Sequence, residues 1–173
     1  NRLHQFDKVE IVRIDVIATA MRAGLSAMDL IDLDLAYAPP YGQAKDPVNQ
    51  TGMVAHNVVT GELVLTGPEA LTGDMPVLDV RTVGEYAAGH MPNSLNIPHT
   101  QLRDRLEEVR TWVETNVGDQ PFVVMCAAGV RSWIGYRIVR HAGFNVTMLS
   151  GGIQTLRAWL GEKAEAVLVK GEG

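Results

Sequence analysis

One stretch decides the fold of this chain: Pro121-Phe122-Val123-Val124-Met125-Cys126-Ala127-Ala128-Gly129-Val130-Arg131-Ser132. It begins with an apolar run of strand length, which leads to a lone cysteine and a loop of small residues. Arg131 follows, and Ser132 is a residue type that opens helices. The stretch therefore predicts a buried strand, a turn, and a helix over residues 132–141, with Cys126 at the carboxyl end of the strand.

Cys126 lies where a thiol can be activated. Only the thiolate is nucleophilic, and the pKa of a thiol falls at a helix N-terminus and beside a fixed cation such as Arg131. Gly129 permits a positive φ, so the loop can turn its backbone N–H groups toward one point and form a cradle for an anion. A lone cysteine after an apolar strand is more often an inert core thiol, but the loop around Cys126 favours an activated one.

On both sides of this stretch, strands alternate with helices. Strands are expected at residues 62–65, 77–81, 94–97 and 146–149, and helices at 83–88, 101–113 and 152–160. This alternation predicts an α/β fold with a parallel sheet flanked by helices. Such sheets bind ligands at the carboxyl ends of their strands, which is where Cys126 falls.

The first sixty residues have a different pattern, with helices expected at 9–23, 26–33 and 47–60. This region is too small to bury a large core alone. We therefore expect three parts: a mainly helical appendage over residues 1–60, an α/β domain over 61–161, and a tail over 162–173. The apolar faces of the appendage need cover, so the sequence allows a homodimer through residues 1–60.

Composition excludes several classes of protein. The 173 residues are 46% hydrophobic and 20% charged with a net charge of -5, which argues against a nucleic-acid partner. No apolar run is long enough to cross a bilayer, so no membrane partner is expected. One cysteine allows no internal disulfide, which favours a reducing, cytoplasmic location. The five histidines show no zinc-ligand spacing, and no metal is expected.

Several motifs, in order along residues 61–160, resemble those of rhodanese domains. They are Leu78-Asp79-Val80-Arg81, Glu85-Tyr86, Gly89-His90-Met91-Pro92, Asn96-Ile97-Pro98, the loop from Cys126 to Ser132, and Ser150-Gly151-Gly152-Ile153 followed by Trp159. The resemblance implies a rhodanese-like sheet and sulfurtransferase activity. In that chemistry the cysteine takes sulfane sulfur from a donor, becomes a persulfide, and passes the sulfur to a nucleophilic acceptor.

The resemblance also implies the site residues. Cys126 would be catalytic, and Ala127, Ala128, Gly129, Val130, Arg131 and Ser132 would form the loop that binds substrate and persulfide. Asp79 and Arg81 would support the site, either by bracing the loop or by pairing with Glu85. The implied partners are small molecules: thiosulfate or a low-molecular-weight persulfide as donor, and a thiol as acceptor. No cofactor is implied.

Loop length distinguishes two reaction classes. Tyrosine phosphatases and arsenate reductases with loops of related design place five residues between cysteine and arginine, which leaves room for a tetrahedral oxyanion. Here four residues separate Cys126 from Arg131. The tighter cradle favours a persulfide sulfur over a phosphoryl group.

The first sixty residues resemble the end of a flavoprotein dimerisation domain. The matching stretches are Arg13-Ile14-Asp15-Val16-Ile17-Ala18-Thr19-Ala20, Leu35-Ala36-Tyr37-Ala38-Pro39-Pro40-Tyr41 and Ala44-Lys45-Asp46-Pro47-Val48-Asn49. The family is that of pyridine nucleotide-disulfide oxidoreductases, in its coenzyme A-disulfide reductase branch, some of which carry a C-terminal rhodanese domain. This sequence has no G-x-G-x-x-G after a strand, so the FAD and NAD sites of that family are missing.

Three functions stay open at this point. The chain could transfer sulfur as an enzyme, carry a persulfide to a partner protein with little turnover of small molecules, or serve as the C-terminal regulatory part of an FAD- and NAD(P)H-dependent oxidoreductase. Oxidoreductase activity is not expected from this chain alone.

Overall fold

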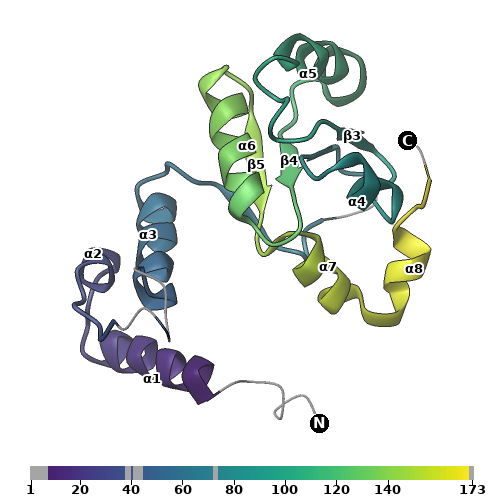
Figure 1. Ribbon diagram of the computed structural model, residues 1–173. Helices are drawn as coiled ribbons and strands as arrows, with labels where there is room; N and C mark the ends of the chain where they lie inside the picture. The colour runs from purple at the N-terminus through teal and green to yellow at the C-terminus, as the bar shows by residue number, and fades with distance from the viewer. Residues whose placement is uncertain (1–7, 38–39, 41–44, 72–73, 172–173) are drawn as a thin grey trace. The chain divides into compact units, whose positions relative to one another are not determined.

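The computed structural model describes residues 8–37, 40, 45–71 and 74–171 (Figure 1). The chain divides into two compact units, residues 1–63 and 64–173. Each unit is described by itself below. Among the described residues, no helix has both the length and the apolar character needed to cross a membrane.

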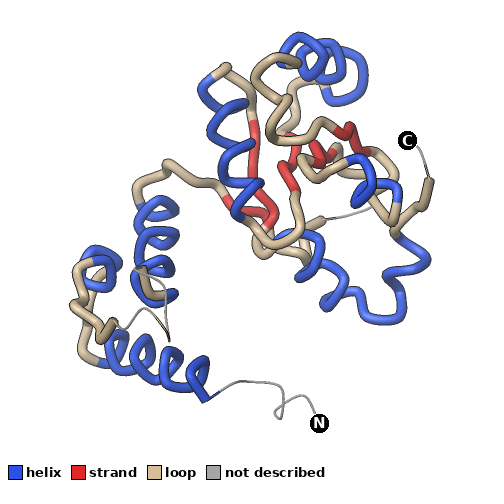
Figure 2. The backbone as a smooth tube through the Cα atoms, in the orientation of Figure 1, coloured by secondary structure: helices blue, strands red, loops and turns tan. Residues whose placement is uncertain are grey.

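The second unit is built on a five-stranded sheet in the order β1-β5-β4-β2-β3. All neighbouring strands run parallel, and the register places Leu78 of β2 beside Leu95 of β3 and Val124 of β4. Figure 2 shows these strands grouped between helices. The predicted α/β fold with a parallel, helix-flanked sheet is confirmed. The strands are β1 (Leu65–Thr66), β2 (Val77–Asp79), β3 (Ser94–Asn96), β4 (Phe122–Met125) and β5 (Val146–Leu149).

From β2 onward, helices lie between consecutive strands, as parallel pairing requires. They are α4 (Val83–Ala87), α5 (Leu106–Trp112) with the π-helical extension η2 (Val113–Val117), and α6 (Val130–His141); α7 (Gly152–Leu160) follows the last strand, β5. The helix α5 begins five residues later than the sequence predicts. Residues 101–105 form turns instead, because the chain reverses after Pro98, whose carbonyl accepts the Gln101 N–H at 2.8 Å.

The core lies on both faces of the central strand β4, whose four residues are all buried. Successive strand side chains point to opposite faces. Val123 and Met125 belong to the cluster that contains Ile153 and Leu156 of α7. On the other face, α6 approaches closely at a glycine: a Cβ added to Gly135 would lie 3.3 Å from Val124. The two helices therefore cover opposite faces of the sheet.

Residues 162–173, expected as a tail, differ from that expectation. After α7 the chain forms a 3₁₀ turn η3 (Gly161–Lys163) and a short helix α8 (Ala164–Val167). Ala164 and Leu168 are buried in the core cluster, and Val169 forms an antiparallel bridge with His90. Burial of these apolar side chains holds the segment against the sheet. A segment this short has no local sequence pattern that would indicate such packing.

The first unit contains three helices: α1 (Lys8–Arg22), α2 (Ala27–Ile31) and α3 (Pro47–Val59). Ala20, Leu30 and Val48 form a small buried cluster. Asn49 supports this cluster. Its side-chain amide donates to three backbone carbonyls, two in the last turn of α2 and one just after the helix. Asp46 caps α3 by accepting the Val48 N–H at 2.9 Å.

This unit keeps apolar side chains at its surface, among them Ile11, Val12, Ile14 and Met21 of α1. The homodimer through residues 1–60 stays a prediction. Within the stretches that resemble a dimerisation domain, residues 38, 39, 41 and 44 lie outside the described residues.

Candidate active site

Cys126 follows β4 directly, at the carboxyl end of the central part of the sheet. Its side chain is buried, with 1% of the residue exposed. The carbonyl of the preceding residue, Met125, accepts the Val80 N–H at 2.9 Å, which ties the end of β4 to the end of β2. The thiol therefore sits on a rigid strand end, at the edge of the sheet where parallel α/β folds bind ligands.

Gly129 turns the loop toward the sulfur. Its φ of 119° lies in the region that favours glycine, and its N–H donates to the Cys126 Sγ at 3.1 Å. Gly129 also caps α6, so the helix begins at Val130, two residues before the predicted start at Ser132. The expectation that Ser132 opens the helix was wrong, because the glycine conformation lets the chain enter the helix earlier.

Hydrogen bonds lower the pKa of the Cys126 thiol. Burial raises its pKa, but the side chain of Ser132 and the backbone N–H groups of Gly129, Ser132 and Ala128 lower it by more, so the net pKa lies below the ordinary value. Each of these donors stabilises the thiolate more than the thiol. The N–H groups of Gly129 and Ser132 belong to the cap and first turn of α6, where N–H groups have no partner within the helix.

The hydroxyl of Ser132 is buried and has no hydrogen-bond partner of ordinary geometry among the described residues. It is nevertheless close enough to the thiol to lower its pKa. A hydroxyl in this position gains a strong acceptor only when the sulfur becomes an anion. Ser132 thus stabilises the thiolate form of Cys126 more than it stabilises the folded protein with a neutral thiol.

The start of α7 holds the carbonyl side of the loop. The N–H of Ile153 donates to the Cys126 carbonyl at 2.9 Å, and the N–H of Gln154 donates to the Ala127 carbonyl at 3.1 Å. Gly152 makes this approach possible, because a Cβ there would lie 2.6 Å from both carbonyl oxygens. The sequence assigned no role in the site to these residues, although the adjacent glycines Gly151 and Gly152 were the signal.

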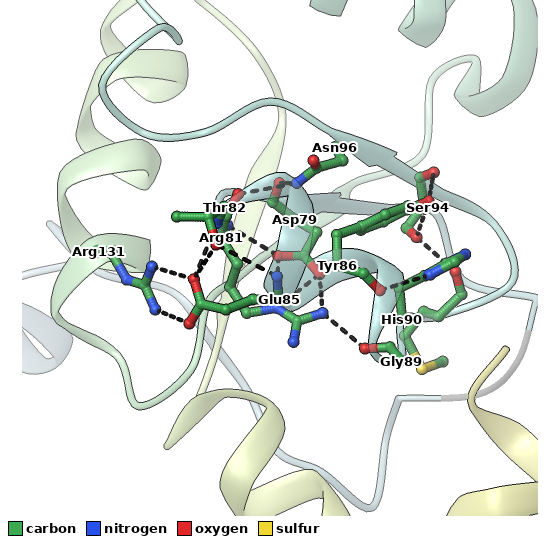
Figure 3. A network of polar contacts seen from close by, with 11 residues as sticks. Asp79, Arg81, Thr82, Glu85, Tyr86, Gly89, His90, Ser94, Asn96 and Arg131 are labelled. Atoms are coloured by element: carbon green, nitrogen blue, oxygen red, sulfur yellow. Dashed lines mark hydrogen bonds and ion pairs between the residues drawn. The ribbon is translucent and has the colours of Figure 1, made fainter. Parts of the chain in front are cut away.

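The guanidinium of Arg131 binds Glu85 of α4 (Figure 3). Its two terminal nitrogens donate to the two carboxylate oxygens, each at 2.7 Å. This contact with Glu85 raises the pKa of Arg131, and the nearby Cys126 raises it further. Glu85 caps α4 together with Thr82, and the hydrogen bonds from Arg131 lower the pKa of Glu85 to about 2. The sequence did not identify Glu85 as a site residue.

Asp79 and Arg81 pair with each other in the interior of the unit (Figure 3). Of the two alternatives that the sequence left open, pairing with Glu85 was wrong, because Arg131 occupies that carboxylate. An Arg81 nitrogen lies 2.6 Å from Asp79 and 2.8 Å from the Gly89 carbonyl, and Asn96 donates to the carbonyls of both Asp79 and Arg81. These contacts tie the end of β2 to the turn at Gly89 and to β3.

A family model for the rhodanese-like domain matches residues 68–158, which is more than half of the chain. The chain belongs to this family. The rhodanese-like domain of this chain is also similar to solved structures. Reduced CoADR-RHD of Bacillus anthracis shares 36% identity at a TM-score of 0.77, over 91% of this chain and 27% of that one. A NAD-dependent persulfide reductase from A. fulgidus shares 40% identity at a TM-score of 0.70, over 83% and 25%.

Curated relatives of the rhodanese-like domain have diverse names. An HTH-type transcriptional regulator of Mycobacterium tuberculosis is 37% identical over 83 residues, which cover 47% of this chain and 34% of that protein. A tRNA uridine(34) hydroxylase of Escherichia coli is 30% identical over 111 residues, which cover 62% and 30%. The chain thus spans about a third of the length of these relatives.

Proposed function

We propose that the rhodanese-like domain is a sulfurtransferase that moves sulfane sulfur through a persulfide on Cys126. The donor is thiosulfate or a low-molecular-weight persulfide, and the acceptor is a thiol. One observation carries the proposal: a buried thiol at the carboxyl end of β4 receives the Gly129 N–H at 3.1 Å. Together with the donors that lower the pKa of Cys126, it forms a site for a sulfur anion.

In the first step the Cys126 thiolate attacks the outer sulfur of the donor. A bond forms between the two sulfurs, and the bond from the outer sulfur to the rest of the donor breaks. The electron pair of that bond leaves with the donor remnant, which is sulfite when the donor is thiosulfate. Backbone N–H groups of the loop and the N-terminus of α6 stabilise the negative charge that the persulfide carries.

In the second step the acceptor thiolate attacks the outer sulfur of the Cys126 persulfide. The new sulfur–sulfur bond forms on the acceptor, and the bond to Cys126 breaks with its electron pair returning to the Cys126 sulfur. No external oxidant or reductant is needed, because each step exchanges one bond to sulfur for another. The hydrogen-bond donors around Cys126 serve both steps, because the first step consumes the Cys126 thiolate and the second step regenerates it.

Kinetics with thiosulfate and cyanide test the proposal. The full chain should form thiocyanate with ping-pong kinetics, because the two steps are separate. Cys126→Ser should abolish turnover. Ser150→Ala, a neighbouring serine outside the loop, is the matched control and should keep activity. Unchanged turnover in Cys126→Ser would overturn the proposal. A persulfide that forms on Cys126 without turnover would instead favour the carrier function.

We also propose that this domain works beside an oxidoreductase. The likeness to CoADR-RHD covers 91% of this chain, which is more than residues 64–173 alone can supply, so it reaches into the first unit. This supports the assignment of residues 1–60 to the end of a dimerisation domain. An antibody against this chain should then detect, in extracts of the source organism, a longer polypeptide whose native form contains flavin. Detection of a chain of this length alone, without flavin, would contradict the assignment.

We place this chemistry in the cytoplasm, because a reducing compartment keeps the thiol free.

A further inference from the structure

A groove outside the sulfur cradle lies along α6 and the turn at residues 101–105. Its volume is about 350 Å³, which is within the range of small-molecule sites. None of its lining residues belongs to the loop from Cys126 to Ser132, so we treat it as a separate site. It is lined by Arg103, Trp133, Ile134, Arg137, Ile138 and His141.

The groove concentrates positive charge on a chain whose net charge is -5. Its lining holds two guanidinium groups, those of Arg103 and Arg137, and no carboxylate. Arginines near Arg103 are paired, since Arg105 binds Glu108 and Arg110 binds Glu107. Within the described part of the chain, neither Arg103 nor Arg137 has an acidic group within ion-pair distance. Their charges are therefore available to a ligand.

Arg137 lies between two ring side chains on one face of α6. Trp133, Arg137 and His141 follow one another at intervals of four residues, which aligns them on the helix. The Arg137 guanidinium lies 5.7 Å from the centre of the Trp133 ring. The Nδ1 of His141 donates to the Arg137 carbonyl at 2.7 Å. Ile134, an exposed side chain, supplies apolar surface beside them.

We propose that this groove binds a phosphate-bearing small molecule with an aromatic or apolar body, such as a nucleoside monophosphate. Guanidinium groups bind phosphate through paired charge-assisted hydrogen bonds, and two arginines in one groove match a doubly charged group. Trp133 and the exposed Ile134 give the rest of the ligand a surface to contact. The volume accommodates a body of that size.

Calorimetric titration of the full chain tests this inference with three probes: adenosine 5′-monophosphate, adenosine, and inorganic phosphate. The monophosphate should bind saturably at one site. Adenosine, which lacks the charge, and inorganic phosphate, which lacks the body, should each bind at least about tenfold more weakly. Equal binding of adenosine and the monophosphate, or no saturable binding of the monophosphate at millimolar concentration, would overturn the proposal.

Matched variants locate the site. Arg137→Gln and Arg103→Gln should each weaken monophosphate binding by about tenfold or more, and both residues are exposed, so folding is preserved. Lys163→Gln removes the same charge from the exposed turn η3 and should leave binding unchanged. Equal weakening by Lys163→Gln would show a general charge effect and contradict the site.

Two further variants separate this inference from the sulfur chemistry. A change in tryptophan fluorescence on addition of the monophosphate should disappear in Trp133→Phe, because that ring lines the groove. Cys126→Ser should retain full monophosphate binding, since Cys126 lies outside the groove. Loss of binding in Cys126→Ser would mean that the ligand occupies the sulfur cradle and would refute a separate site.

Discussion

Replacing Ser132 by alanine should lower the reactivity of Cys126 while leaving the fold almost unchanged. The hydroxyl is buried without a hydrogen-bond partner of ordinary geometry among the described residues, yet it lowers the pKa of the thiol. Its loss removes a donor to the thiolate and little from the resting protein. The free energy of unfolding should therefore change by less than about 1 kcal/mol, because an unsatisfied buried hydroxyl is costly to keep.

The size of the effect on Cys126 follows from the charge of the acceptor. A hydrogen bond to a charged group contributes about 1.5–3 kcal/mol. At a pH below the pKa of the thiol, the thiolate fraction should then fall roughly 10- to 100-fold. The remaining thiolate is more nucleophilic, because nucleophilicity rises with pKa at a Brønsted slope of about 0.4–0.5. The net decrease in alkylation rate at such a pH is therefore about 3- to 16-fold.

The assay is the rate of Cys126 alkylation by iodoacetamide as a function of pH, with ultraviolet absorbance of the thiolate as a second readout. The rate profile of Ser132→Ala should move to higher pH. Ser26→Ala is the control: it deletes the same atom from the cap of α2, should cost about 1 kcal/mol of stability, and should leave the alkylation profile unchanged. A profile of Ser132→Ala that coincides with wild type would refute the reasoning.

Three other substitutions test the supports of the cradle. The pKa of Glu85 is about 2, below its ordinary 4.5. The stability that its carboxylate contributes is therefore present above about pH 4.5 and is lost as the pH falls toward 2. Because the side chain is partly exposed, this loss is about 1 kcal/mol. Denaturation at about pH 6 and about pH 3 should show this loss in wild type and not in Glu85→Gln, and equal losses would contradict it. Gly152→Ala places a side chain at a φ of 63° and 2.6 Å from two loop carbonyls, which costs at least about 1–3 kcal/mol; sulfur transfer should fall more than about tenfold, whereas Gly84→Ala, with open space around it, should keep wild-type turnover. Asp79→Asn leaves the buried Arg81 charge uncompensated and should cost about 3–5 kcal/mol in urea unfolding; a cost below about 1 kcal/mol would mean that the pair is not needed.

Much of this architecture could be predicted from the sequence, because its signals are local. The apolar run before Cys126 predicted a buried strand, and Gly129 predicted a turn that presents N–H groups. The helix expected at residues 47–60 begins at Pro47 in the structure, as α3. The periodic spacing of strands and helices predicted the parallel sheet.

The parts that the sequence did not predict depend on contacts between distant residues. Arg131 and Glu85 are forty-six positions apart, and only the fold brings α4 to the start of α6. Ser132 predicted the start of a helix by its type, but the backbone at Gly129 decided the boundary. Residues 161–171 have no strong periodicity of their own, and their position depends on burial of Ala164 and Leu168 against the sheet.

The central claim, that Cys126 carries sulfane sulfur, is tested most directly by intact-mass measurement of the full chain after incubation with thiosulfate. The account predicts a gain of about 32 Da, the mass of one sulfur atom, located on Cys126 by peptide mapping. Cyanide should then remove it, and Cys126→Ser should show no gain. No added sulfur in the wild-type protein, or the same gain in Cys126→Ser, would contradict the account.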